Sequence, residues 1–315
     1  MRKPSGSAKS AASHCSEIGE VQDLETLKSR QNPLIRHFRA LSADAALRRE
    51  EGLFVCDGGK LLEEALREGI NPRCVLWKDE KPSGAPRFQE EYLLDGSLFD
   101  YVSPMTNSPG PLFTVPIPVQ QEEMPVSQAL VLEELQDPGN VGTILRTADA
   151  FGIDCVILLE GCADLYAPRT VRATMGAIFR QKAIRMKQGE LLSFCERNGL
   201  HLWAAALSPR ARDLREVKLS RAAVCIGSEG HGLSGGLLAL CENELIIPMR
   251  GKAESLNAAI AASVIMWEMQ RYTASANFGT TAGRRNCLAR LAVLGLACPP
   301  ESQPQGPNCR TERLR

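Results

Sequence analysis

The sequence predicts an α/β protein with two domains, the second of which contains a mainly parallel sheet. From residue 129 onward, strand-like apolar runs alternate with helical patterns, which is typical of a parallel sheet covered on both faces. Six prolines fall within residues 104–125 and separate this region from an earlier α/β pattern. The chain has 315 residues, more than the roughly 250–300 at which a single core stops growing.

The first domain is predicted over residues 25–105, where helical and strand-like patterns alternate. An Asn-Pro pair at residues 32–33 opens an apolar-periodic helix, and a second helix over residues 60–68 ends at a glycine. Strand-like runs occupy residues 53–56 and 73–77. Together these patterns predict a small α/β domain.

The regions outside the two domains differ in composition. The prolines predict a linker over residues 106–124, because proline cannot continue a helix or a central strand. Residues 1–24 lack the apolar core of a signal peptide, so a disordered tail is expected, and a transit peptide is the less favoured alternative. Residues 274–315 show no sustained period, so no fold is assigned and a second disordered tail is expected.

The second domain is predicted over residues 125–273. Its strands are expected at residues 129–133, 155–159, 201–205, 222–226 and 244–248. Its helices are expected at residues 141–151, 170–179, 235–240 and 256–272.

Composition excludes several classes of protein. The 11 cysteines contain no CxxC pair and the four histidines show no zinc spacing, so no metal site is expected and reduced thiols of a cytoplasmic protein are predicted. No apolar run approaches the roughly 18 residues that a membrane span needs. The basic and acidic residues balance at 37 each. Basic side chains nevertheless cluster in residues 28–49 and 165–187, which could bind phosphates or simply form solvated helix faces.

Three stretches lie where a strand ends and a helix begins, the position at which open α/β sheets bind ligands: residues 137–148, 226–234 and 247–257. In the first stretch, Asn140 could cap the helix. Arg146 lies one turn after Gly142, near a helix start suited to a polyanion. A capped helix with a surface arginine is the competing interpretation.

The second stretch contains a GxGxxG pattern at residues 230–235, which could indicate a dinucleotide site. A dinucleotide-binding half needs further strand and helix units with an acidic residue about 20 positions on, and only one strand remains after residue 235. The third stretch offers Ser255 or Asn257 as the cap of a helix that begins with closely packing alanines.

Taken together, the three stretches resemble the motifs of the SpoU (TrmH) family within the SPOUT class of RNA methyltransferases. The resemblance covers residues 129–272 and also residues 25–105, through Asn32-Pro-Leu-Ile and Arg49-Glu-Glu-Gly-Leu-Phe-Val. It implies an α/β fold in which a knotted (trefoil) parallel-sheet methyltransferase domain follows a small ribosomal-protein-like domain that binds the RNA substrate. Asp57 departs from the pattern, because the family more usually has glutamate there.

The resemblance also implies a homodimer that uses S-adenosyl-L-methionine to methylate a ribose 2′-hydroxyl in RNA. It implies that the cofactor is held around Gly227, Ile247, Met249 and Leu256. The residues that it implies at or near the reacting ribose are Asn140, Arg146, Glu229, Ser255 and Asn257. The expected RNA contacts are Arg30, Arg36, Arg39, Arg169 and Arg172.

A guanidinium stays protonated in proteins, so Arg146 is expected to anchor a phosphate and stabilise the developing alkoxide rather than act as a base. The proton could then leave to Glu229, water or phosphate. Ribosomal RNA is the favoured substrate and tRNA the alternative. A non-catalytic RNA-binding relative and a small-molecule enzyme are the remaining alternatives; the basic runs and the separate first domain make the latter less natural.

Overall fold

The computed structural model describes residues 24–118, 125–251 and 255–271. The chain forms two compact units, divided between Ile117 and Pro118. Apart from Leu24, the predicted tails at residues 1–24 and 274–315 lie outside the described residues.

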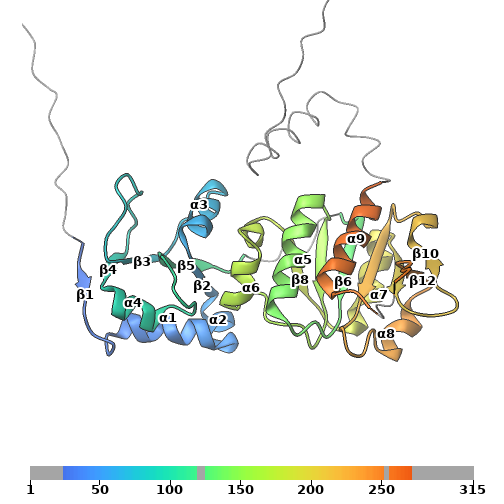
Figure 1. The fold of residues 1–315 in the computed structure, drawn as a ribbon, viewed down its shortest axis with the longest axis horizontal. Coiled ribbons are helices and arrows are strands. Elements are labelled where there is room, and N and C mark those ends of the chain that lie inside the picture. Colours follow the sequence, from blue (N-terminus) through green and yellow to red (C-terminus); the bar gives the residue numbers. More distant parts are fainter. Residues whose placement is uncertain (1–23, 119–124, 252–254, 272–315) are drawn as a thin grey trace, which may run out of the picture. The chain divides into compact units, whose positions relative to one another are not determined.

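The first unit is built on a mixed five-stranded sheet in the order β1-β4-β3-β5-β2 (Figure 1). Its strands are β1 Thr26–Leu27, β2 Leu53–Asp57, β3 Cys74–Lys78, β4 Glu91–Leu94 and β5 Leu112–Pro116. Its helices are α1 Pro33–Ala43, α2 Ala45–Glu51, α3 Gly59–Arg67 and α4 Gly96–Val102. The predicted start of α1 is confirmed, since the Asn32 side chain accepts a hydrogen bond from the Leu34 amide at 2.8 Å and Pro33 opens the helix.

Strand β5 lies inside the predicted linker, so the prediction of a linker over residues 106–124 is wrong for residues 112–116. The strand pairs antiparallel with both β2 and β3 and is almost wholly buried. Prolines are tolerated here because Pro111 precedes the strand and Pro116 is its last residue, where no ladder donor is required. Proline density alone therefore placed the boundary too early.

The second unit contains a seven-stranded sheet in the order β10-β12-β9-β11-β6-β7-β8, in which every pair of neighbours is parallel. The strands are β6 Gln128–Leu132, β7 Cys155–Leu158, β8 Ala183–Arg185, β9 His201–Ala205, β10 Arg212–Asp213, β11 Ala222–Ile226 and β12 Asn243–Ile246. The predicted parallel sheet is confirmed. Its central strands β6, β7 and β11 are buried along their whole length, as expected for a sheet covered on both faces.

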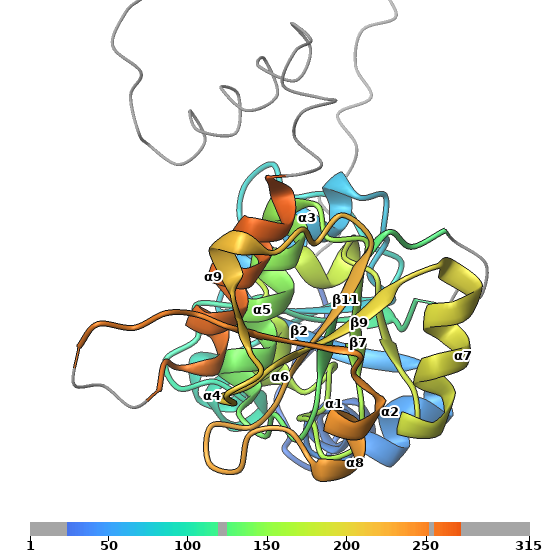
Figure 2. The same cartoon turned by 90° about the vertical axis from the view of Figure 1, so that its right-hand side faces the viewer.

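Helices cover both faces of this sheet. They are α5 Pro138–Phe151, α6 Pro168–Ala173, α7 Gln188–Asn198, α8 Gly235–Leu240 and α9 Ala258–Gln270, with 3-10 turns η1 Ala177–Phe179 and η2 Leu214–Glu216. Figure 2 shows α5 and α9 side by side, with α7 on the other side of the sheet. The predicted helix over 170–179 is instead α6 followed by η1, because Gly176 between them takes a left-handed φ of 95°.

Two close contacts fix α5 and α9. A Cβ on Gly142 would lie 2.5 Å from both the Thr170 carbonyl oxygen and the Ala173 Cβ, so only glycine lets α5 approach α6 this closely. The buried Gln128 Nε2 donates to the Met269 carbonyl at 2.8 Å and thereby ties the end of α9 to the start of β6.

The cysteines of the described residues are free thiols. Burial raises the pKa of Cys155 to about 12, so this thiol stays protonated at neutral pH. Among the described helices, none has the length and apolar character to cross a bilayer.

Candidate functional site

The three motif stretches meet at one edge of the second sheet. They follow β6, β11 and β12, whose carboxyl ends lie on the same side because the strands are parallel. The loop after β6 leads into α5, the loop after β11 contains Glu229, and the segment after β12 leads into α9. The sheet thus brings together side chains that are far apart in sequence.

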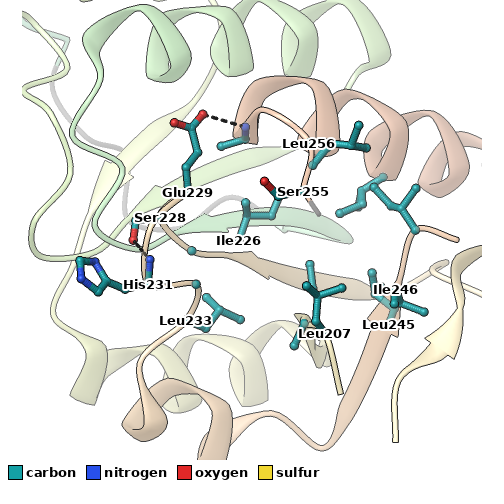
Figure 3. A pocket seen from close by; sticks show the side chains of 18 of the residues that line it. Leu207, Ile226, Ser228, Glu229, His231, Leu233, Leu245, Ile246, Ser255 and Leu256 are labelled. Atoms are coloured by element: carbon teal, nitrogen blue, oxygen red, sulfur yellow. Dashed lines mark hydrogen bonds between the residues drawn. The ribbon is translucent and has the colours of Figure 1, made fainter. Parts of the chain in front are cut away.

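The Glu229 carboxylate is the point at which the three stretches are joined. Its Oε1 accepts hydrogen bonds from Asn140 Nδ2 at 3.0 Å and from Asn257 Nδ2 at 2.9 Å. It also accepts from the backbone amide of Ala258 at 3.1 Å (Figure 3). In addition, Asn257 Nδ2 donates to Asn140 Oδ1 at 3.1 Å, which closes a three-membered cluster.

Asn257 has a second function as the N-cap of α9. Its Oδ1 accepts from the amides of Ala259 at 3.0 Å and Ile260 at 3.3 Å. The side chain therefore caps the helix with its oxygen and holds Glu229 with its nitrogen. The positive end of the α9 dipole also lies beside the carboxylate, which favours a negative charge there.

The loop that carries Glu229 is held closed at its base. Ser228 and Gly232 exchange two backbone hydrogen bonds, of 3.1 and 2.9 Å. A Cβ on Gly227 would lie only 2.1 Å from the carbonyl group of Gly232, so the loop can fold back only if residue 227 is glycine. Beyond the loop, Ser234 caps α8.

The buried carboxylate of Glu133 anchors the far end of this loop. It accepts hydrogen bonds from the Ser234 amide and hydroxyl, both at 2.7 Å. Sequence analysis placed Glu133 only at the end of a strand and missed this function. The signal available was a charged residue at the end of an otherwise apolar buried strand, which needs a polar partner.

A cavity of about 470 Å³ opens beside the loop (Figure 3). All four residues predicted to hold the cofactor line it, namely Gly227, Ile247, Met249 and Leu256. Ser255 and Glu229 line it as well. Most of its other walls are aliphatic, and residues 205–207, at the carboxyl end of β9, form a wall that sequence analysis missed. A volume and lining of this kind suit a small organic ligand bound partly through backbone groups.

A second cavity of about 410 Å³ lies on the other side of the same loop. Its walls are residues 134–137, Asn140 and residues 228–231. Residues 228–231 line both cavities, so Glu229 stands at the boundary between them. This arrangement can hold two ligands on either side of one carboxylate.

Arg146 lies apart from the cluster. It is exposed on α5, six residues after Asn140, which corresponds to about 9 Å along the helix and a turn of about 240°. It lines neither of the two cavities. Within the described part of one chain, the structure therefore groups Asn140, Glu229 and Asn257 but does not bring Arg146 to them.

The predicted RNA contacts occupy two places. In the first unit, the guanidinium carbons of Arg30 and Arg39 lie 4.5 and 4.1 Å from the centre of the Tyr101 ring, while Arg36 is exposed on α1. In the second unit, Arg169 and Arg172 are exposed on α6.

One member of the first basic run has a structural function instead. Arg48 is buried and donates to the carbonyl oxygens of Leu41 and Ser42 at the end of α1.

Comparison with known proteins identifies the family. The model of the SpoU rRNA Methylase family matches residues 127–267. An uncharacterized tRNA/rRNA methyltransferase of Synechocystis is 33% identical over 80% of this chain and 95% of its own length. The Bacillus subtilis 23S rRNA (guanosine(2553)-2′-O)-methyltransferase RlmP is 29% identical over 78% of this chain and its entire length.

A solved structure has the same fold. The SpoU methyltransferase AviRb from Streptomyces viridochromogenes, in complex with the cofactor AdoMet, superposes with a TM-score of 0.68. It is 26% identical and covers 78% of this chain and all of its own. The two units thus have the architecture of an RNA-modifying methyltransferase. The chain is a member of the SpoU family.

Replacing Gly227 with alanine should abolish cofactor binding, because the added Cβ would overlap the Gly232 carbonyl group and force the loop out of the cavity wall. Gly235→Ala is the matched control just beyond the loop, since a Cβ there meets nothing within 4 Å and the residue lines neither cavity. Calorimetric titration with S-adenosylmethionine separates the two variants. Equal affinity in both would show that the closed loop is not required for binding.

Proposed function

We propose that this chain methylates a ribose 2′-hydroxyl of ribosomal RNA. Its class follows from its family, which makes it an S-adenosylmethionine-dependent RNA 2′-O-methyltransferase. Ribosomal RNA is favoured because the matched family and RlmP, a relative matched over its entire length, both carry that substrate in their names. The observation that carries the proposal is the placement of Glu229 between two cavities of the right kind.

The larger cavity fits the cofactor. Its aliphatic walls suit an adenine ring, and the peptide groups at Gly227, Ile247 and Leu256 would bind the polar edge of the adenosyl group. Met249 also lines this cavity, as does Ser255, which is proposed to lie near the reacting ribose. When bound, the cofactor supplies a methyl group on a positively charged sulfur.

The cluster around Glu229 would orient the nucleophile. Three donors converge on Oε1, so Oε2 is the oxygen left to accept a hydrogen bond from the ribose 2′-hydroxyl. Asn140 and Asn257 fix the carboxylate in place, which holds the hydroxyl in line with the methyl group. The 2′-hydroxyl proton would leave to Glu229, to water or to phosphate.

Arg146 would complete the site from a second copy of the chain. The exposed face of α9 carries an apolar stripe of Ile260, Val264 and Trp267, spaced one to two helical turns apart. Trp267, whose side chain contacts Phe151 of α5, is 62% exposed. A homodimer packed through α5 and α9 would cover this stripe.

In such a dimer the exposed face of α5 would lie at the interface. Arg146 of one copy could then reach the nucleotide bound at the site of the other copy. It would then bind a phosphate and stabilise the developing alkoxide, as its charge and planar fork allow. Light scattering tests the assembly. A mass of twice 34.3 kDa is expected, and a fully active monomer would rule it out.

We also infer the trefoil knot from the path of the chain after β12. Strand β12 is second from one end of the strand order, yet α9, which follows it, packs against α5. The amide of Ala258, the first residue of α9, donates a hydrogen bond to Glu229 in the loop after β11. The described residues 247–251 and 255–257 would therefore lie on either side of the loop at residues 227–234. A knot is a rare exception among folds, and the family resemblance is what favours it here.

The first unit would recruit the RNA. Arg30 and Arg39, gathered around Tyr101, offer two cations and an aromatic ring, a combination that binds phosphates and stacks on bases. Arg36 on α1 and the exposed arginines 169 and 172 would add phosphate contacts whose strength falls with salt. The free thiols among the described cysteines fit a cytoplasmic location.

Methylation of unmodified transcripts tests the substrate. The full-length protein would be incubated with S-adenosylmethionine and either ribosomal RNA transcripts or bulk unmodified tRNA, and 2′-O-methylated nucleotides would be mapped by mass spectrometry. Methylation of the ribosomal RNA is expected. Methylation of tRNA alone would favour the tRNA alternative, and cofactor binding without methylation of either RNA would favour a non-catalytic relative.

The role of Arg146 predicts a specific kinetic defect. Arg146→Ala should bind S-adenosylmethionine normally, because the residue lines neither cavity. Single-turnover methylation should fall by a factor on the order of a hundred, the scale for removing one oxyanion donor. Arg146→Lys should recover little, since an ammonium lacks the two-pronged fork. A near-normal rate in the alanine variant would remove Arg146 from the reaction.

A further inference from the structure

The second cavity has a charge pattern that constrains its ligand. Three acidic residues, Glu134, Asp137 and Glu229, line it, and no lysine or arginine is among the described residues that do so. A phosphate would be repelled from such a cavity at neutral pH. A nucleobase is neutral and presents N–H donors, so it is the part of an RNA chain that this cavity can accept.

The three carboxylates are not equally available. Glu229 is engaged with Asn140 and Asn257, and Asp137 Oδ1 caps α5 by accepting from the Gly139 amide at 2.6 Å. In the described part of the chain, the Glu134 side chain has no hydrogen bond or ion pair. It is exposed and lines the cavity. Glu134 is therefore the carboxylate that has both oxygens available to a ligand.

The backbone holds Glu134 in an unusual position. Its φ is 52°, in the left-handed region that residues other than glycine rarely adopt. The neighbouring loop packs against it, since a Cβ on Gly161 would lie 2.9 Å from Glu134 Cγ. The Glu134 amide donates to the Glu160 carbonyl at 3.3 Å. These contacts hold the backbone and the Cγ of Glu134 beside the cavity and leave its carboxylate exposed.

We propose that this cavity receives the base of the target nucleotide and that Glu134 selects guanine. The proposal rests on the proposed function, because it assumes that the ribose of the same nucleotide lies at Glu229. Guanine is the base whose pairing edge presents two adjacent donors, N1–H and the N2 amino group, which match the two oxygens of a carboxylate. Adenine and cytosine present a donor beside an acceptor, and uracil presents one donor between two acceptors.

The substitution Glu134→Gln tests the proposal because it keeps the size and the backbone strain while replacing one acceptor with a donor. Glu160→Gln is the matched control, since Glu160 is exposed on the adjacent loop but does not line the cavity. Full-length protein saturated with S-adenosylhomocysteine, which blocks the cofactor cavity, would be mixed with equimolar adenosine, cytidine, guanosine and uridine. Saturation-transfer NMR then reports which nucleoside binds.

Guanosine should give the strongest transfer with the wild type and with Glu160→Gln. In Glu134→Gln its advantage should fall about tenfold, the scale on which a bidentate contact discriminates bases, with adenosine gaining. Equal signals for the four nucleosides, or an unchanged preference in Glu134→Gln, would overturn the proposal.

A second readout separates this inference from the proposed function. The same three proteins would be incubated with S-adenosylmethionine and ribosomal RNA transcripts, and the four 2′-O-methylnucleosides would be quantified after digestion. The wild type should yield 2′-O-methylguanosine, and Glu134→Gln should yield at least about tenfold less of it. A product dominated by another nucleoside contradicts the selection of guanine. No methylated product at all would count against ribosomal RNA as the substrate, while the NMR result would still decide the ligand of the cavity.

Discussion

The site depends on a single carboxylate oxygen. Oε1 of Glu229 binds Asn140 from α5, Asn257 from the cap of α9 and the first amide of α9 itself. Asn140 belongs to the first motif stretch, whereas Asn257 and the Ala258 amide lie at the end of the third. All three donate to Glu229, which belongs to the second stretch. Because hydrogen bonds to a charged acceptor are among the stronger ones, their loss would release α9 and the loop after β11 together. The two cavities beside Glu229 both have walls in that loop.

The rest of the second unit positions these donors. Parallel pairing puts the ends of β6, β11 and β12 at one edge, and Gly142 lets α5 pack closely against α6. Gln128 holds the far end of α9. Glu133 fixes Ser234 and hence the end of the loop. Apolar burial thus stabilises the scaffold, and a few buried polar contacts fix the positions of the helices and the loop at the site.

Much of this architecture could be predicted from the sequence, because local signals and the global fold agree. Strand and helix alternation gave the parallel sheet, and the three motif stretches proved to be the loops around the cavities. The strand β5 was missed because its prolines resemble those of a linker, although they lie at positions that need no ladder donor. The surroundings of Arg146 and Glu133 could not be predicted, since they depend on which helix face packs and on partners about 100 residues away.

The substitution Asn257→Asp provides the most direct test of the central claim. Aspartate caps a helix as well as asparagine does, so α9 should keep its N-cap. The variant loses the Nδ2 donor and places a second carboxylate beside Glu229, so single-turnover methyl transfer should fall at least about tenfold, as expected for loss of a charged hydrogen bond. A rate equal to that of the wild type, with cofactor binding intact, would show that the positioning of Glu229 by Asn257 is not what the reaction requires.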